Sequence, residues 1–147
     1  MQVICKNENE TKELAKKISK IITLGDILCL DGDLGAGKTT FTKYLCKNLG
    51  VDGYVNSPSY TLVNEYNGNV DIYHFDVYRI FSVEELYEIG FEEYISSNKI
   101  IIIEWAKKIE EIIPKEAIWI DISLGEDINE RIFRIKGKKI ERKIWRF

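Results

Sequence analysis

The chain has 147 residues, a formal net charge of −3, 45% hydrophobic residues and 31% charged residues, which predicts one soluble globular domain over residues 1–147. The weak negative charge argues against a general nucleic-acid coat protein, although a local basic patch stays possible. Three cysteines without metal-type spacing indicate a reduced, cytoplasmic protein with thiols as packing groups. The N-terminus does not resemble a signal peptide, and no apolar run is long enough to cross a membrane, so no membrane contact is expected.

The first predicted elements are a strand over Gln2–Cys5 and a helix over Asn7–Thr23. Asn7 can cap this helix, with Glu10 three residues later. Its apolar stripe comprises Leu14, Ala15, Ile18, Ile21 and Ile22. Thr11 lies near the N-terminal end, where it could face an adenine ring or be an ordinary exposed residue. The pattern alone favours the exposed residue.

The next stretch contains a phosphate-binding motif. Gly32, Gly37, Lys38 and Thr39 fit G-x-x-x-x-G-K-[ST], after a short apolar strand over Ile27–Leu30 and before residues at helical spacing. Glycines let successive backbone N–H groups face an anion, and the following helix directs its positive end to the same place. The motif therefore predicts that a lysine contacts the β- and γ-phosphates and that a threonine hydroxyl contacts Mg²⁺. The nucleotide-contacting residues predicted here are Gly32, Asp33, Leu34, Gly35, Ala36, Gly37, Lys38, Thr39 and Thr40.

A hairpin is predicted after this helix. Strands over Leu62–Tyr66 and Val70–Arg79 flank Asn67-Gly68, a strong signal for a type I′ turn. Strand alternation places His74 and Asp76 on one face. Alone, this pattern favours a solvated sheet face. His74 is the only histidine, so neither a histidine metal cluster nor a Ser-His triad is available.

An acid follows the most apolar strand. Ser82 and Glu85 form a capping box that opens a helix extending to Ile95. The stretch Lys99–Trp105 contains four consecutive isoleucines, as in a parallel strand buried on both faces, and Glu104 stands at its C-terminal end. Ligands of open α/β sheets bind beyond such ends, so Glu104 is a candidate site acid.

The C-terminal third completes the sheet. A short helix over Ala106–Ile113 precedes a hairpin formed by strands Ala117–Leu124 and Arg131–Lys136. The basic tail after Lys136 is expected to be solvated, and a phosphate or RNA contact using Trp145 is the alternative. The predicted fold class is therefore α/β and P-loop NTPase-like, with a mostly parallel central sheet flanked by helices and extended by antiparallel hairpins.

Four blocks resemble the TsaE (YjeE) family of bacterial ATPases that act in tRNA threonylcarbamoyladenosine synthesis. They are GDLGAGKTT at Gly32–Thr40, SPSYT at Ser57–Thr61, HFDVYR at His74–Arg79 and IEW at Ile103–Trp105. The blocks come in the family's order, and their span covers about half the chain. The second block departs mildly, by near-equivalent residues, from the SPTFT of the family.

The resemblance implies ATP binding and hydrolysis with Mg²⁺, a slow rate for the protein alone, and work with the partners TsaB and TsaD. The contact with tRNA would be indirect, through that complex. By position, Lys38 and Thr39 would hold phosphate and Mg²⁺, and Asp76 and Glu104 would be the two site acids. The residues implied in this way are Lys38, Asp76 and Glu104 for catalysis, and Thr39, Asp76 and Glu104 for the metal. Thr61, in a switch-like segment, and Trp105 would be further neighbours of the nucleotide, and Thr11 is a candidate for the same role.

Other functions share the loop. A small nucleotide or metabolite kinase would need an acceptor pocket and usually an arginine-bearing lid, and no arginine-rich insertion follows residue 80. A non-catalytic nucleotide-sensing module is disfavoured by the intact set of candidate residues. A GTPase is disfavoured because an N-K-x-D signature is missing. Arg79 is a candidate arginine finger, but strand parity directs it away from Asp76.

Overall fold

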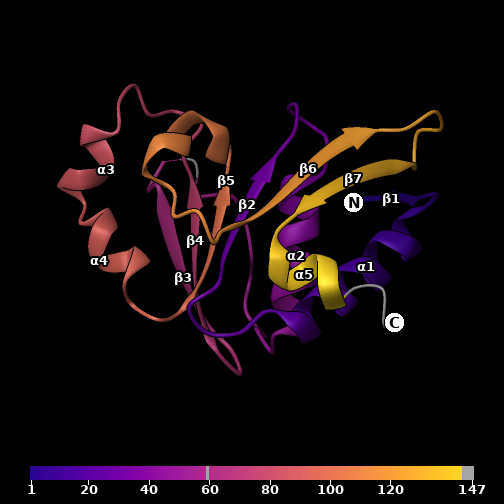
Figure 1. Cartoon of the computed structure of the whole chain (residues 1–147), viewed down its shortest axis with the longest axis horizontal. Helices are drawn as coiled ribbons and strands as arrows, with labels where there is room; N and C mark the ends of the chain where they lie inside the picture. The colour runs from indigo at the N-terminus through magenta and orange to yellow at the C-terminus, as the bar shows by residue number, and fades with distance from the viewer. Residues whose placement is uncertain (59, 144–147) are drawn as a thin grey trace.

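The computed structural model describes residues 1–58 and 60–143. Its strands form one seven-stranded sheet in the order β1-β7-β6-β2-β5-β4-β3 (Figure 1). The strands are β1 Gln2–Cys5, β2 Ile27–Asp31, β3 Val63–Asn67, β4 Asp71–Asp76, β5 Ile100–Glu104, β6 Ile118–Leu124 and β7 Arg131–Lys136. The helices are α1 Glu8–Ile21, α2 Lys38–Asn48, α3 Glu84–Glu88, α4 Phe91–Ile95, the 3₁₀ helix η1 Ala106–Ile112 and α5 Lys138–Lys143.

The centre of the sheet is parallel, and its edges are antiparallel. Strands β6, β2, β5 and β4 pair in parallel, whereas β3 joins β4, β7 joins β6 and β1 joins β7 in antiparallel fashion. This arrangement confirms the predicted α/β fold with a parallel centre and antiparallel hairpins. The C-terminal ends of β2, β4 and β5 therefore meet at one edge of the sheet.

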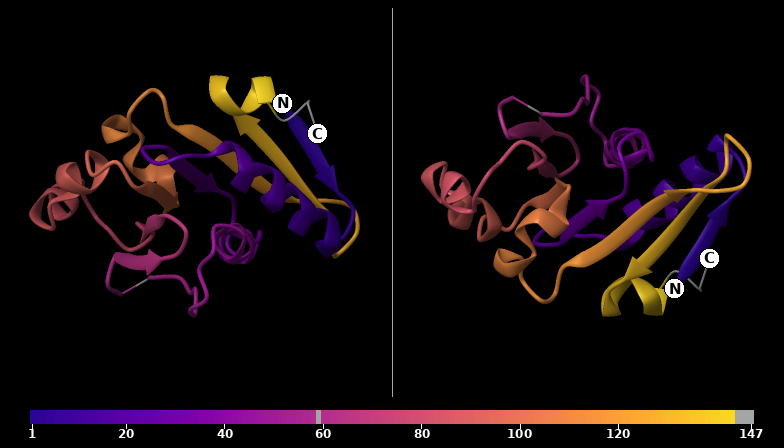
Figure 2. Two further views of the ribbon diagram at one scale, coloured as in Figure 1. Left: turned by 90° about the horizontal axis from the view of Figure 1, so that it is seen from below. Right: turned by 90° about the horizontal axis from the view of Figure 1, so that it is seen from above.

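Helices cover both faces. One core contains apolar side chains from α1, α2 and α5, and the other contains side chains from α3, α4 and η1. The latter elements lie beside the β3–β4 end of the sheet in Figure 1, and Figure 2 shows the arrangement from two further sides. In β5, Ile100 and Ile102 belong to the first core, whereas Ile101 and Ile103 belong to the second. The prediction of a strand buried on both faces is thus confirmed.

The predicted helix from Ser82 to Ile95 is two short helices. Gly90 has a φ of +81° and separates α3 from α4, because a left-handed residue interrupts the helical hydrogen-bond pattern. Only the glutamate half of the capping box forms. The Glu85 carboxylate accepts hydrogen bonds from the backbone N–H groups of Phe81 and Ser82, but the Ser82 hydroxyl does not cap the helix.

The predicted type I′ turn is also wrong. Asn67 is the last residue of β3 and pairs with Asp71, so three residues connect the strands, and neither Asn67 nor Gly68 has a positive φ. Gly68 instead lies so close to the end of α2 that a Cβ would be 2.7 Å from the Leu49 carbonyl oxygen. The glycine thus serves close packing rather than left-handed geometry. The second strand also ends earlier than predicted, at Asp76.

The C-terminal basic segment is partly ordered against the core. Residues 138–143 form α5, and Ile140 is fully buried, so this part is not simply a solvated tail. The alternative involving Trp145 lies outside the described residues. All three cysteines are buried without a disulfide, as expected for packing groups, and burial raises the pKa of Cys46 to about 12. In the described part of the chain, a helix of the length and apolarity needed to cross a membrane is not found.

One buried acid faces away from the phosphate-binding loop. Asp31 ends β2, is 5% exposed, and its Oδ2 atom has no hydrogen-bond partner. Burial is the main cause that raises the pKa of this carboxyl above the ordinary value of 3.8. The folded state therefore holds the proton more tightly than the unfolded state, and folding stability falls as pH rises above 3.8 and through the raised pKa.

We expect Asp31→Asn to remove this dependence. The free energy of unfolding of the variant, relative to that of the wild type, should increase as pH rises from the ordinary aspartate range, because the amide carries no charge to bury. Urea unfolding across pH measures the difference. Asp52→Asn is the control, since Asp52 is exposed and is not among the charged groups that act on Asp31. A difference from wild type that is the same at every pH would contradict the assignment.

Candidate nucleotide site

The phosphate-binding loop connects β2 to α2. Gly35 and Gly37 have φ values of +82° and +113°, and α2 begins immediately at Lys38. Backbone N–H groups therefore gather at the positive end of a helix, which is the arrangement that binds anions. Next to the loop lies an open cavity of about 340 Å³. Its lining comprises Leu34, Gly35, Gly37, Lys38, Thr39, Thr40, Ser57, Asp76, Tyr78, Glu104 and Trp105.

Gly32 is required for a different reason from the other loop glycines. It has a φ of +147°, and a Cβ there would lie 2.3 Å from the Ile122 carbonyl oxygen. We expect Gly32→Ala to destabilise the fold by about 2–4 kcal/mol. The Ile122 backbone must move away from the added Cβ, and the alanine must also adopt a strained φ. Urea unfolding measures this. Gly35→Ala is the control: it has a positive φ but nothing within 4 Å, so its cost should be about 1 kcal/mol. Equal losses would contradict the steric explanation.

The Lys38 amine is held inside the loop. Its Nζ donates to the carbonyl oxygens of Gly32 at 2.5 Å and Asp33 at 3.0 Å, and lies 3.9 Å from the centre of the Trp105 ring. Burial lowers the pKa of Lys38, and the nearby Glu104 carboxylate opposes this shift. The positive charge is thus placed at the loop and shielded from water, where it would be strongly attracted to phosphate.

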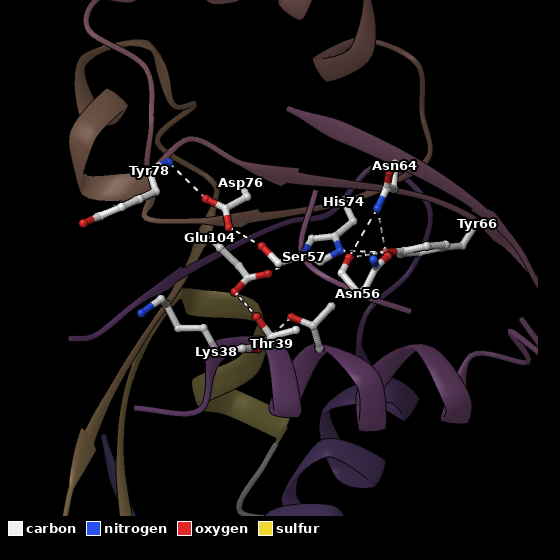
Figure 3. A network of polar contacts seen from close by, with 11 residues as sticks. Lys38, Thr39, Asn56, Ser57, Asn64, Tyr66, His74, Asp76, Tyr78 and Glu104 are labelled. Atoms are coloured by element: carbon white, nitrogen blue, oxygen red, sulfur yellow. Dashed lines mark hydrogen bonds and ion pairs between the residues drawn. The ribbon is translucent and has the colours of Figure 1, made fainter. Parts of the chain in front are cut away.

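The two predicted acids meet opposite Thr39 (Figure 3). Asp76 and Glu104 are register partners on the parallel strands β4 and β5, so their side chains leave the sheet on the same face. The Thr39 hydroxyl donates to Glu104 Oε1 at 2.9 Å. Asp76 accepts from the Ser57 hydroxyl and from the Tyr78 backbone N–H. The structure therefore brings together the loop, Thr39 and both acids.

His74 is part of this polar cluster, contrary to the interpretation of a solvated face. It is fully buried, its Nε2 lies 2.5 Å from Glu104 Oε2, and its Nδ1 lies 2.9 Å from the Tyr66 hydroxyl. The physical reason is that the first core covers this face, and Ile72, two residues earlier, belongs to that core. Sequence parity placed His74 on the same face as Asp76, but it could not show that the core covers this face at His74.

Two further predicted residues lie differently. Trp105 lines the cavity; it has a φ of +64°, and its ring is 4.7 Å from that of Tyr78. Thr61 does not line this cavity. It is exposed, and its hydroxyl donates to the Val63 carbonyl and to Asn64. Another residue of the same sequence block, Ser57, lines the cavity instead. Sequence reasoning missed Ser57, although it belongs to a quoted block.

A second cavity of about 190 Å³ adjoins the other side of the loop. Its lining comprises Glu8, Thr11, Gly35, Ala36, Gly37, Thr40, Asn129, Arg131 and Phe133. Thr11 is only 6% exposed, so the interpretation as an exposed residue is wrong. Sequence reasoning also missed Arg131, which begins β7 and whose Nε donates to the Ala36 carbonyl at 3.0 Å. The only sequence signal for Arg131 was its position at the start of a strand.

The donor set fits a metal that arrives with a nucleotide. Within the described residues, no group of three or more His, Cys, Asp or Glu side chains could hold a metal ion. Thr39, Asp76 and Glu104 instead offer a few hard oxygen atoms on one side of the cavity. Mg²⁺ typically takes one or two protein oxygens and completes its coordination with phosphates and water. The residues present therefore fit Mg²⁺ bound to a nucleotide better than a resident structural metal.

A parallel sheet with a glycine-rich loop between β2 and α2, and with acids at the adjacent strand ends, defines the fold of P-loop NTPases. The crystal structure of Bacillus subtilis YdiB is similar, with a TM-score of 0.80 and 36% identity, covering 99% of this chain and 89% of that one. The family model described as "Threonylcarbamoyl adenosine biosynthesis protein TsaE" matches residues 5–133. The chain belongs to the TsaE family, which acts in tRNA threonylcarbamoyladenosine biosynthesis.

Individual relatives support this membership. The tRNA threonylcarbamoyladenosine biosynthesis protein TsaE of Bacillus subtilis (strain 168) is 43% identical over 137 residues, covering 92% of this chain and 85% of the relative. The protein of the same name from Treponema pallidum (strain Nichols) is 30% identical over 132 residues, covering 90% of this chain and 98% of the relative. The similarity thus extends over nearly the whole length, beyond the phosphate-binding loop.

Proposed function

We propose that this protein is the Mg²⁺-dependent, ATP-binding and ATP-hydrolysing component of the threonylcarbamoyladenosine machinery, and that it acts with TsaB and TsaD in the cytoplasm. The observation that carries the proposal is the convergence of Thr39, Glu104 and Asp76 at the loop that holds Lys38. Oxygen ligands, a buried cation and an anion-binding helix end are the parts that phosphoryl transfer needs. Their arrangement supports hydrolysis as well as binding.

In this proposal the triphosphate and the adenine of the nucleotide bind on different sides of the loop. The triphosphate lies in the loop formed by residues 32–39, with Lys38 at the β- and γ-phosphates. Thr39 and Glu104, with Asp76 directly or through water, hold Mg²⁺, which would neutralise charge on the phosphates when bound. The adenine side is assigned to the second cavity, where Thr11 and Arg131 flank the loop. Asp76 either completes the metal shell or orients the attacking water.

The site supports slow turnover by the protein alone. Among the described residues that line the larger cavity there is no arginine. The Arg79 guanidinium lies 4.6 Å from the centre of the Tyr60 ring, and Arg131 is held on the Ala36 carbonyl. A cation that stabilises the transition state commonly accelerates phosphoryl transfer by about 10³-fold or more. We therefore propose that the partners, TsaB and TsaD, complete the site.

Steady-state ATP hydrolysis with and without TsaB and TsaD tests this proposal. We expect a slow Mg²⁺-dependent rate alone and a faster rate with both partners; equal rates would contradict a partner-completed site. Deletion of the gene, followed by nucleoside analysis of bulk tRNA, tests the pathway, and loss of the threonylcarbamoyl nucleoside is the expected result. Phosphate transfer to a small acceptor would instead favour a kinase, and nucleotide binding without turnover even with partners would favour a sensing module.

A further inference from the structure

A continuous chain of hydrogen bonds, buried except at Thr39, leads from β3 to the phosphate-binding loop (Figure 3). The Tyr66 hydroxyl contacts His74 Nδ1, His74 Nε2 contacts Glu104 Oε2, and Glu104 Oε1 accepts from the Thr39 hydroxyl. The four residues come from β3, β4, β5 and α2. His74 is 0% exposed and Glu104 is 1% exposed, so water does not compete for the contact between these two side chains.

The same chain is fastened to the segment between α2 and β3. The Tyr66 hydroxyl oxygen also lies 3.1 Å from the Asn56 carbonyl oxygen, and the Asn64 side-chain amide donates to the same carbonyl at 3.3 Å. The next residue, Ser57, donates to Asp76. Two consecutive residues thus connect to the two acids of the site. Ser57 contacts Asp76 directly, and Asn56 is connected to Glu104 through Tyr66 and His74.

An ionised carboxylate can only accept hydrogen bonds, so Nε2 carries the hydrogen in the contact between His74 and Glu104. This bond fixes Oε2 and leaves Oε1 directed at Thr39. An unrestrained glutamate side chain populates several rotamers, whereas a carboxylate that coordinates a metal has to be held in a single rotamer. The hydroxyl of Tyr66 in turn fixes the plane of the imidazole ring through Nδ1.

We propose that His74 is a positioning residue: it orients the Glu104 carboxylate toward Thr39 and, through Tyr66, makes this orientation depend on the placement of the segment at Asn56 and Ser57. The inference rests on the proposed function, because Glu104 is a site acid only if the cavity takes a Mg²⁺–nucleotide. His74 does not line the nucleotide cavity, so it would act on a bound nucleotide only through Glu104. A histidine with a packing role only would lower stability when replaced but would leave the kinetic constants of the folded protein unchanged.

Kinetics of four variants separate these roles. His74→Leu should lower kcat for ATP hydrolysis about 10- to 100-fold and raise the Mg²⁺ concentration for half-maximal rate, while KM for ATP changes less than about threefold. His74→Gln should restore most of kcat, because its side-chain amide can replace the Nε2–H donor. Tyr66→Phe should give a smaller loss, of about threefold. Tyr73→Phe is the control, since that hydroxyl contacts Lys99 on the opposite face of the sheet.

A second readout does not depend on activity. His74 is the only histidine in the sequence, so the imidazole NMR signals of the untagged protein belong to it without further assignment. We expect a slowly exchanging Nε2–H signal that shifts in Glu104→Gln and in Tyr66→Phe but not in Tyr73→Phe. A wild type that does not hydrolyse ATP would overturn the proposed function, yet this signal would still report the contact with Glu104. An Nε2–H signal unchanged by Glu104→Gln, or wild-type kcat and Mg²⁺ dependence in folded His74→Leu, would overturn the inference.

Discussion

Replacing Lys38 with alanine is expected to reduce ATP hydrolysis by about 10³-fold, the largest effect of any single substitution in this site. Lys38 is 5% exposed, and its amine has only carbonyl oxygens of its own loop as hydrogen-bond partners. A phosphate oxygen carries a larger negative charge than a carbonyl oxygen, so a bound triphosphate would draw the amine toward itself. Because negative charge on the leaving phosphate increases in the transition state, the loss should affect kcat as well as nucleotide affinity.

Single-turnover hydrolysis and nucleotide titration measure both effects for Lys38→Ala. Lys47→Ala is the matched control, because Lys47 belongs to the same helix but is exposed in its last turn. Thermal unfolding must accompany the kinetics, since the buried amine also ties together the carbonyls of Gly32 and Asp33. A folded Lys38→Ala protein that hydrolyses ATP within tenfold of the wild-type rate would contradict the assigned role.

Local patterns predicted much of the fold and the loop. The four consecutive isoleucines of β5 identified a strand buried on both faces because they exclude an amphipathic element. The motif from Gly32 to Thr39 could be placed because its chemistry requires a strand before it and a helix after it, and both patterns were visible. Glu104 could be proposed because the end of a parallel strand is a general position for ligands. In each case the pattern that led to the prediction can be read from a short, continuous stretch of the sequence.

The missed features depend on contacts between distant segments. His74 looked like a residue of a solvated face because alternation gives the side of a sheet but not what covers it. Arg131 lies 95 residues after the Ala36 carbonyl to which it donates, and no local pattern joins them. Thr11 is buried because its helix packs beside the loop. Gly68 was interpreted as a residue of a left-handed turn, whereas the close Leu49 carbonyl leaves no space for a side chain there.

Glu104→Gln is expected to lower kcat for ATP hydrolysis about 100-fold and to leave ATP affinity without Mg²⁺ unchanged or tighter. The amide oxygen can accept from the His74 Nε2–H group while the amide NH2 group donates to the Thr39 hydroxyl oxygen, so the geometry can persist. The charge that would hold the metal is lost. Removing a buried negative charge from beside a triphosphate also removes repulsion, which is why binding should not weaken. Stopped-flow nucleotide binding and steady-state hydrolysis give the two numbers. Glu110→Gln is the control, because Glu110 lies in η1 and lines a different cavity, beside Asp31. This variant should keep the wild-type nucleotide affinity and hydrolysis rate. A Glu104→Gln protein that hydrolyses ATP at the wild-type rate would show that Glu104 is not a site acid.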